Sequence, residues 1–327
     1  MKKSYGSYIV EGKIIYLLWF LEIVFRFFFA IRGLLIPLKL KPFAADTENI
    51  RKILVIEIVG MGDAVLATSV VRPLKERFPD AKIVFLGNPA FIPIVENSFD
   101  RCIPLSAPWV RKKSKLSWIS PDWIKFLKET ALLRRERFDL SIDIRCDFRA
   151  AYLSHRIGAR HRLGFDFGLG TYFYTDPVPY GKLVHRSHEY AKILEHFDLP
   201  TDSCSPYLTT GDSNIESILD KIELEREKYY LIHPGAARKY KIWPADSFAR
   251  VINVLHKTHP HLQPVLIGGS KDITAMNSIE TLTGNQIMTY QPSIGELNAL
   301  IAGAKFVICN NTGVMHIAAA LGKNVVT

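Results

Sequence analysis

Cysteine is scarce in this chain. Only four cysteines occur among 327 residues, and no two of them have the Cys-x-x-Cys spacing. A disulfide-stapled scaffold needs more cysteine than this, and a four-cysteine zinc site needs the Cys-x-x-Cys spacing, so neither is indicated. Scattered thiols are typical of a reducing compartment, and we therefore expect a cytoplasmic protein. The four residues are Cys102, Cys146, Cys204 and Cys309.

Two further absences narrow the chemistry. The Asp-x-Asp spacing occurs nowhere, so a metal-bridged diphosphate is not indicated and we predict no metal site. The predicted strand 82–87 ends at Gly87-Asn88, without the acidic residue that holds the ribose in nicotinamide dinucleotide enzymes. A nicotinamide oxidoreductase is therefore disfavoured. No internal repeat or low-complexity tract is present, and 48% hydrophobic composition over this length predicts two domains of roughly 150 residues.

Positive charge is plentiful but unevenly placed. The formal net charge is +10, with an excess of basic residues in 1–45 and again in 101–121. Two separate basic stretches predict anionic partners at two places, and they disfavour a uniformly basic nucleic-acid binder.

The N-terminal stretch 14–38 is long and apolar but carries Glu22, Arg26 and Arg32. On insertion scales these charges nearly cancel the gain from the apolar residues, so spanning a bilayer is not clearly favoured. We predict that residues 1–45 form a hydrophobic helix that lies on an anionic membrane surface. A core helix docked on a domain is the alternative, and a cleaved signal peptide fits less well.

The stretch 53–78 predicts a buried strand, a glycine turn and an amphipathic helix. Gly60 and Gly62 permit a tight reversal, and Asp63 follows as a natural N-cap. Its carboxylate is then expected at the carboxyl end of a parallel strand, where open α/β sheets bind ligands. A capped helix alone would also explain Asp63.

A second such unit is predicted near the C-terminus. The strand 305–309 leads into Asn310-Asn-Thr-Gly-Val-Met-His316, where Thr312 or Asn311 is expected to cap a helix. The free N–H groups at that helix start form a ready site for a diphosphate, and Gly313 permits close approach of a ligand. His316 lies in the first turn, although a structural histidine would be equally common there.

These segments, together with Lys241-Ile-Trp-Pro244, resemble glycosyltransferase family 9, the ADP-heptose:lipopolysaccharide heptosyltransferases. The resemblance covers about residues 51–327 and implies the α/β GT-B fold, two Rossmann-like domains that face across a cleft. We place the acceptor-binding domain at 46–205 and the nucleotide-sugar domain at 206–327. It implies Asp63 as the general base and a donor site formed by Lys241, Asn311, Thr312, Gly313, Met315 and His316. Taken alone, Lys241 would be a solvated surface lysine.

The acceptor candidates follow from the same resemblance. Lipid A and inner-core sugars carry phosphates, and basic residues near the acceptor are expected to orient them. The candidates are Gly62, Arg111, Lys112, Lys113, Arg145 and Arg149. The run at 111–113 could instead be a solvated loop, and Arg145 and Arg149 could be ordinary salt-bridge partners.

The implied reaction is an inverting, metal-independent transfer of heptose, or a related sugar, from an ADP-sugar to a lipopolysaccharide core or another anionic lipid-linked glycan. No cofactor beyond the donor is expected, and the enzyme would act peripherally on the inner face of the cytoplasmic membrane. Asn311 stands where the family usually has an acidic residue, and the chain ends on the final predicted strand. Both departures favour an alternative: a non-catalytic, membrane-attached nucleotide- or glycan-binding member that acts in envelope assembly.

Overall fold

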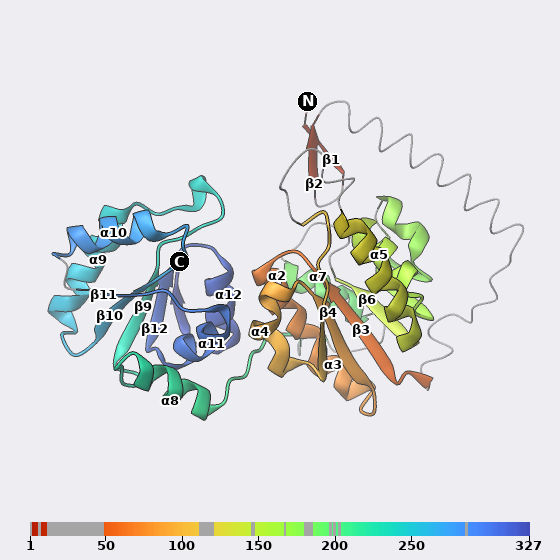
Figure 1. Ribbon diagram of the computed structural model, residues 1–327, viewed down its shortest axis with the longest axis horizontal. Helices are drawn as coiled ribbons and strands as arrows, with labels where there is room; N and C mark the ends of the chain where they lie inside the picture. The colour runs from red at the N-terminus through yellow and green to blue at the C-terminus, as the bar shows by residue number, and fades with distance from the viewer. Residues whose placement is uncertain are drawn as a thin grey trace, which may run out of the picture. The chain divides into compact units, whose positions relative to one another are not determined.

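The computed structural model describes residues 2–5, 8–11, 49–110, 121–144, 148–166, 168–179, 186–195, 198, 201, 204–284 and 287–327 (Figure 1). Most of the hydrophobic helix expected over residues 1–45 lies outside these residues, and where residues 2–5 and 8–11 are described they are not helical. What is described near the N-terminus is an antiparallel pair of strands, β1 (Lys2–Tyr5) and β2 (Tyr8–Glu11). Among the described residues, no helix combines the length and apolar character needed to cross a bilayer.

The chain divides into two units, and the second is not one continuous piece. The first comprises residues 1–59, 69–89 and 99–204; the second comprises 60–68, 90–98 and 205–327. The two short segments were expected in the first domain. They group with the second because the Asn298 side-chain amide donates to the Ile94 carbonyl at 2.7 Å and the Tyr207 N–H donates to Thr68 Oγ1 at 3.0 Å.

The first unit contains a six-stranded, all-parallel sheet of order β5-β4-β3-β6-β7-β8. This is the doubly wound order. The chain adds β4 and β5 on one side of β3, and then crosses over to add β6, β7 and β8 on the other side. The strands are β3 (Lys52–Glu57), β4 (Lys82–Gly87), β5 (Arg101–Pro104), β6 (Leu140–Asp143), β7 (His161–Asp166) and β8 (Asp176–Pro179).

Helices α5 (Pro121–Leu133) and α6 (Phe148–Ile157) cover one face of this sheet. Alternate strand residues such as Leu54 and Ile56 meet Phe126 of α5 and Leu153 of α6 in a fully buried cluster. The unit also contains α3 (Val71–Arg77) and α7 (Arg186–Glu195). The apolar, β-branched strands are those expected of a sheet covered on both faces.

The helix expected after the glycine turn is broken in two. α2 (Met61–Ala67) and α3 are separated by a 3₁₀ turn at Thr68–Val70. Pro73 has no N–H to donate to the Ser69 carbonyl, and the Thr68 hydroxyl donates to the Val65 carbonyl at 2.7 Å, so regular α-helical bonding stops there.

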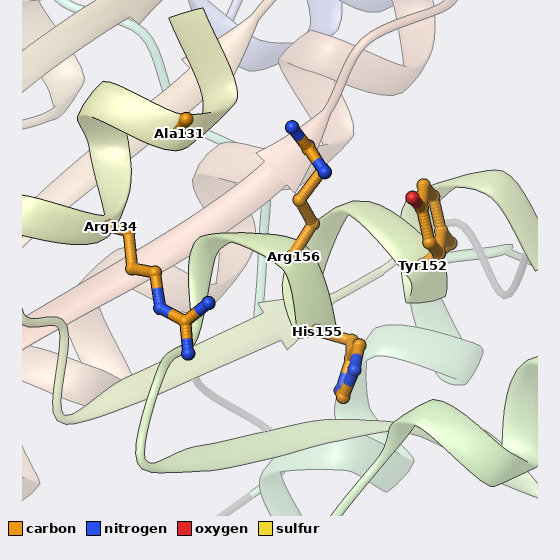
Figure 2. Close-up of a pocket in the computed structure, with 5 residues that line it drawn as sticks. All are labelled: Ala131, Arg134, Tyr152, His155 and Arg156. Atoms are coloured by element: carbon orange, nitrogen blue, oxygen red, sulfur yellow. The ribbon is translucent and has the colours of Figure 1, made fainter. Parts of the chain in front are cut away.

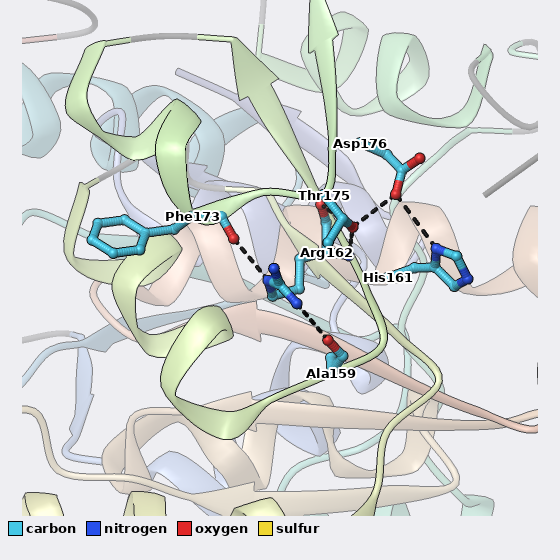
Figure 3. Close-up of polar contacts among 6 residues, drawn as sticks. All are labelled: Ala159, His161, Arg162, Phe173, Thr175 and Asp176. Atoms are coloured by element: carbon cyan, nitrogen blue, oxygen red, sulfur yellow. Dashed lines mark hydrogen bonds and ion pairs between the residues drawn. The ribbon is translucent and has the colours of Figure 1, made fainter. Parts of the chain in front are cut away.

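A polar cluster joins the edge strand β8 to its neighbour β7 (Figure 3). Asp176 accepts from the Thr175 hydroxyl at 2.7 Å and lies 3.4 Å from Nδ1 of the buried His161. The Arg162 guanidinium donates to the carbonyls of Phe173 and Ala159 at 2.7 and 2.8 Å. These contacts satisfy the buried polar groups of the sheet edge, a structural role.

The second unit has a five-stranded parallel sheet of order β11-β10-β9-β12-β13. Its strands are β9 (Tyr229–His233), β10 (Gln263–Ile267), β11 (Met288–Tyr290), β12 (Phe306–Cys309) and β13 (Asn324–Val326). The helices are α2, α4 (Ile92–Val95), α8 (Asp212–Lys221), α9 (Ala245–Thr258), α10 (Ile273–Leu282), α11 (Ile294–Gly303) and α12 (Gly313–Ala320). Helices α9 and α10 bury one face of the sheet.

Candidate active site

In the second sheet, the chain adds β10 and β11 on one side of β9 and then crosses over to add β12 and β13 on the other side. In open α/β sheets, ligands bind outside the carboxyl ends of the two strands at such a switch point. Here those ends lead into Pro234-Gly235 after β9 and into Asn310-Asn311-Thr312 after β12.

Asn310 joins the loops at this switch point. Its buried side chain donates to the Pro234 carbonyl at 2.7 Å and accepts from the Trp243 N–H at 3.0 Å. The loop after β9, the Trp-Pro loop and the end of β12 are thereby held together by one amide. Asn310 was not among the predicted site residues, and its place as the first residue after a buried strand was its only signal in the sequence.

Lys241 and Asn311 form a polar pair beside the start of α12. Lys241 ends a short 3₁₀ turn (Lys239–Lys241), and its Nζ donates to Asn311 Oδ1 at 3.0 Å. Because the Asn311 side chain is neutral, it does not offset the positive charge of the lysine. Pro244 was expected inside the first turn of the next helix; it is the N-cap of α9, with an extended ψ of 145°.

The N-cap residue of α12 makes no side-chain capping hydrogen bond. Thr312 is the N-cap residue in an extended conformation, and its hydroxyl does not bond to the helix. Within the described part of the chain, the buried Thr312 Oγ1 has no hydrogen-bond partner. The first N–H groups of an α-helix have no intrahelical acceptor, so this end carries partial positive charge.

Two glycines allow α2 and α12 to meet at their first turns. A Cβ on Gly62 would lie 2.6 Å from His316 Cδ2, and a Cβ on Gly313 would overlap the sulfur of Met61. The His316 ring therefore rests on the backbone next to Asp63. Within the second unit, residues 62, 63, 313 and 316 are thus brought into one neighbourhood.

Asp63 is not the N-cap that the sequence predicts. Helix α2 begins at Met61 with Gly60 as its N-cap, so Asp63 lies in the first turn. A Cβ on Gly60 would lie 2.5 Å from Asp63 Oδ2, which shows that the carboxylate folds back over that glycine. The half-buried carboxylate still benefits from the positive end of the helix dipole.

His233, the last residue of β9, and Asp272, in the loop after β10, form a further polar group. Asp272 Oδ2 accepts from the Gly269 N–H at 2.9 Å and lies 3.9 Å from His233 Nε2. Burial lowers the pKa of His233, opposed by the nearby Asp272 carboxylate. A Cβ on Gly235 would overlap Asp272, so a larger residue would displace the carboxylate. Sequence analysis missed both polar residues, although His233 directly precedes the Pro-Gly turn.

Fewer contacts locate the remaining predicted site residues. Arg149 lies on α6 in the first unit, with its guanidinium carbon 5.8 Å from the ring centre of Trp109. Met315 is half-buried on α12. Arg111, Lys112, Lys113 and Arg145 lie outside the described residues. In the part of the chain that the structure covers, no three His, Cys, Asp or Glu side chains are grouped to hold a metal ion.

Comparison with known proteins agrees with this architecture. The family model "Glycosyltransferase family 9 (heptosyltransferase)" matches residues 126–327. Lipopolysaccharide heptosyltransferase 3 of Escherichia coli K12 is 26% identical over 283 residues, covering 81% of this chain and 78% of that protein. Lipopolysaccharide heptosyltransferase 2 of the same strain is 23% identical over 299 residues, covering 84% and 81%.

Solved structures show the same fold. The structure of E. coli ADP-heptose lps heptosyltransferase II superposes with a TM-score of 0.70 at 23% identity, covering 84% of this chain and 83% of that one. E. coli heptosyltransferase WaaC with ADP-2-deoxy-2-fluoro heptose gives 0.67 at 20% identity, covering 84% and 87%. These likenesses establish an α/β fold with parallel sheets.

Proposed function

Because this chain belongs to glycosyltransferase family 9, the heptosyltransferase family, we propose that it transfers a heptose, or a related sugar, from an ADP-sugar to an anionic lipid-linked acceptor such as the lipopolysaccharide core. The two relatives named above are called lipopolysaccharide heptosyltransferases, which supports heptose transfer. The observation that carries the proposal is the uncapped start of α12, with His316 in its first turn and the Lys241–Asn311 pair beside it.

The donor diphosphate is assigned to this helix start. Backbone N–H groups and the positive helix end suit phosphate oxygens, and Lys241 adds a full charge. Negative charge that develops on the departing ADP would be stabilised there without a metal ion. Asp272 lies after β10, where doubly wound folds place an acidic residue for a ribose hydroxyl, and it is our candidate for that contact.

The chemical step is a single displacement with inversion. The acceptor hydroxyl oxygen attacks the anomeric carbon of the sugar while the bond from that carbon to the ADP oxygen breaks. The hydroxyl proton passes to the Asp63 carboxylate. The position of Asp63, one residue from the Gly62 backbone on which His316 rests, supports this role because base and donor site then adjoin.

The acceptor side of the proposal uses basic residues. The acceptor phosphates would contact Arg111, Lys112, Lys113, Arg145 and Arg149. The Gly62 backbone, next to Asp63, would lie beside the reacting hydroxyl. We assign residues 1–45 to an anionic membrane surface on the cytoplasmic side. Deleting 1–45 should then reduce sedimentation with anionic vesicles, and undiminished sedimentation would exclude that assignment.

Asp63→Asn tests the central claim. General-base catalysis typically contributes about 10²- to 10⁴-fold, so kcat should fall by that factor while ADP affinity, measured by calorimetry, stays unchanged. Loss of ADP binding as well would indicate a damaged fold. Wild-type turnover in the variant would refute Asp63 as the base.

A non-catalytic binding protein is the second candidate, favoured by Asn311 in place of the family's usual acidic residue. ADP would bind and raise the melting temperature, yet no ADP would be released from an ADP-sugar in the presence of acceptor. Measuring both on the wild-type protein separates the two functions.

A further inference from the structure

Exposed apolar side chains of the first unit are gathered in one place. Among its described residues, the large apolar side chains that remain exposed are Ile124 (60%), Leu127 (38%), Leu132 (56%) and Phe148 (39%). Three of them lie on α5, and Phe148 begins α6, which packs beside it. The exposed apolar surface of this unit is thus concentrated on two neighbouring helices, and concentrated apolar surface marks an interaction site.

The same side of α5 carries cations between the apolar residues. We define the α5 outer face by six of the exposed residues of this helix, Ile124, Lys125, Leu127, Lys128, Ala131 and Leu132. Helical spacing brings them together, whereas Phe126 and Thr130 point into the core. The exposed Asp122 lies beside this face, and Lys125 is 3.8 Å from Glu129, so Lys128 is the unpaired cation of the face among the described residues. Lysine stems can lie along apolar surface while their ammonium groups reach outward. Apolar residues interleaved with lysines are typical of helices that lie in a membrane interface.

A concave basic site adjoins this face. A cavity of about 480 Å³ is lined by Ala131, Arg134, Tyr152, His155 and Arg156. Arg134 begins the 3₁₀ turn (Arg134–Glu136) that follows α5, whereas Figure 2 shows the other polar residues coming from α6. Arg156 is fixed in place, because Nε donates to Thr130 Oγ1 at 2.7 Å and Nη2 to the Leu127 carbonyl at 2.9 Å.

Arg134 is available for a ligand. Its side chain is exposed, and within the described part of the chain its guanidinium makes no hydrogen bond or ion pair. Tyr152 and His155 each pack edgewise or tilted on Phe173, at 5.6 and 5.4 Å between ring centres, which fixes their rings at the cavity wall. Arg134 and Arg156 both line the cavity, and the Arg134 guanidinium, which has no other partner among the described residues, favours an oxyanion such as a phosphate.

We propose that the α5 outer face docks on a membrane and that the cavity takes the phosphate of an anionic phospholipid. The charge pattern favours lipid over a protein partner, because lysine is depleted from protein–protein interfaces whereas anionic headgroups attract it. This contact is separate from residues 1–45 and does not depend on the sugar-transfer reaction.

The test uses full-length protein and vesicles of phosphatidylcholine alone or in equimolar mixture with phosphatidylglycerol. An environment-sensitive fluorophore on the Lys128→Cys variant should shift to the blue when the mixed vesicles are added. The same fluorophore on Val254→Cys, a 59% exposed position of α9 in the second unit, should not shift. Wild-type protein treated with the reagent corrects for the native cysteines.

Binding of variants then separates the apolar and the phosphate contacts. Ile124→Asp should lower the vesicle partition coefficient about tenfold or more on mixed vesicles, and Val254→Asp should leave it unchanged. Arg134→Ala should lower it about fivefold on mixed vesicles and leave it unchanged on phosphatidylcholine. Far-ultraviolet circular dichroism confirms that each variant is folded.

A fluorophore at position 128 that stays in a water-like environment while the protein sediments with vesicles would overturn the proposal, since the membrane would then be bound elsewhere. So would equal losses for Ile124→Asp and Val254→Asp. If the Arg134→Ala variant binds both vesicle types as the wild-type protein does, the assignment of a lipid phosphate to the cavity is wrong.

Discussion

Gly62→Ala is the substitution whose outcome depends most directly on the meeting of α2 and α12. In a helix, replacing glycine with alanine stabilises by about 1 kcal/mol through backbone entropy. At Gly62 the new methyl would lie 2.6 Å from His316 Cδ2 and 3.2 Å from Nε2, so the ring must move. Overpacking of this kind costs about 1 to 3 kcal/mol. The net effect on the free energy of unfolding should therefore be a loss of roughly 0 to 2 kcal/mol.

Gly295→Ala is the matched control. Gly295 lies in the first turn of α11, and a Cβ there would meet nothing within 4 Å. This variant should be stabilised by up to about 1 kcal/mol, opposite in sign to Gly62→Ala. Chemical denaturation of both variants measures the difference in the free energy of unfolding. A lower ADP affinity of Gly62→Ala, measured by calorimetry, would show that moving His316 disturbs the donor site.

A double-mutant cycle completes the test. In the background of His316→Ala the methyl at position 62 no longer meets a ring, so Gly62→Ala should cost nothing further in ADP affinity. Residues in contact give coupling free energies of about 0.5 to 3 kcal/mol. If the two substitutions are additive, or if Gly62→Ala is as stable and as active as Gly295→Ala, the packing of His316 on Gly62 is refuted.

Three other predictions follow from the second unit. Lys241→Met should weaken ADP binding by about 1.5 to 3 kcal/mol, while Lys257→Met on α9 should not; equal effects in calorimetry would remove Lys241 from the site. Thr312→Val should raise the free energy of unfolding of the ligand-free protein by about 1 kcal/mol, because a buried hydroxyl without a partner among the described residues is removed; a decrease in denaturation experiments would mean that the hydroxyl caps α12. Burial depresses the pKa of His233 below its usual 6.5 despite Asp272, so the unfolded state binds more protons. The stability that neutral His233 contributes is present above pH 6.5 and lost as the pH falls through the folded-state pKa, and His233→Asn should flatten that part of the stability curve; an unchanged curve would contradict the assignment.

Local sequence signals predicted the framework well. The strand predicted at 82–87 is β4 with the same bounds, and the strand expected at 305–309 is β12 (Phe306–Cys309). Buried parallel strands have nearly continuous apolar runs, which a single sequence displays directly. Glycine turns at strand ends were equally visible, and they mark the loops where the candidate site lies.

What the sequence did not predict are features that depend on distant partners. The carbonyl of Ile94 and the amide of Asn298 are 204 residues apart, and Asn310 reaches Pro234 across 76. No local pattern encodes such pairs. The break between α2 and α3 was different in kind, because Pro73 was visible but its effect on helix bonding was not taken into account.

The discontinuous second unit constrains how this enzyme could be recombined. Its backbone enters or leaves that unit at 59/60, 68/69, 89/90, 98/99 and 204/205. A chimera spliced only at residue 205 would keep Asn298 but exchange the segment that supplies its buried carbonyl partner, Ile94. Donor preference should therefore be transplanted between relatives as three pieces, 60–68, 90–98 and 205–327, rather than as a C-terminal half.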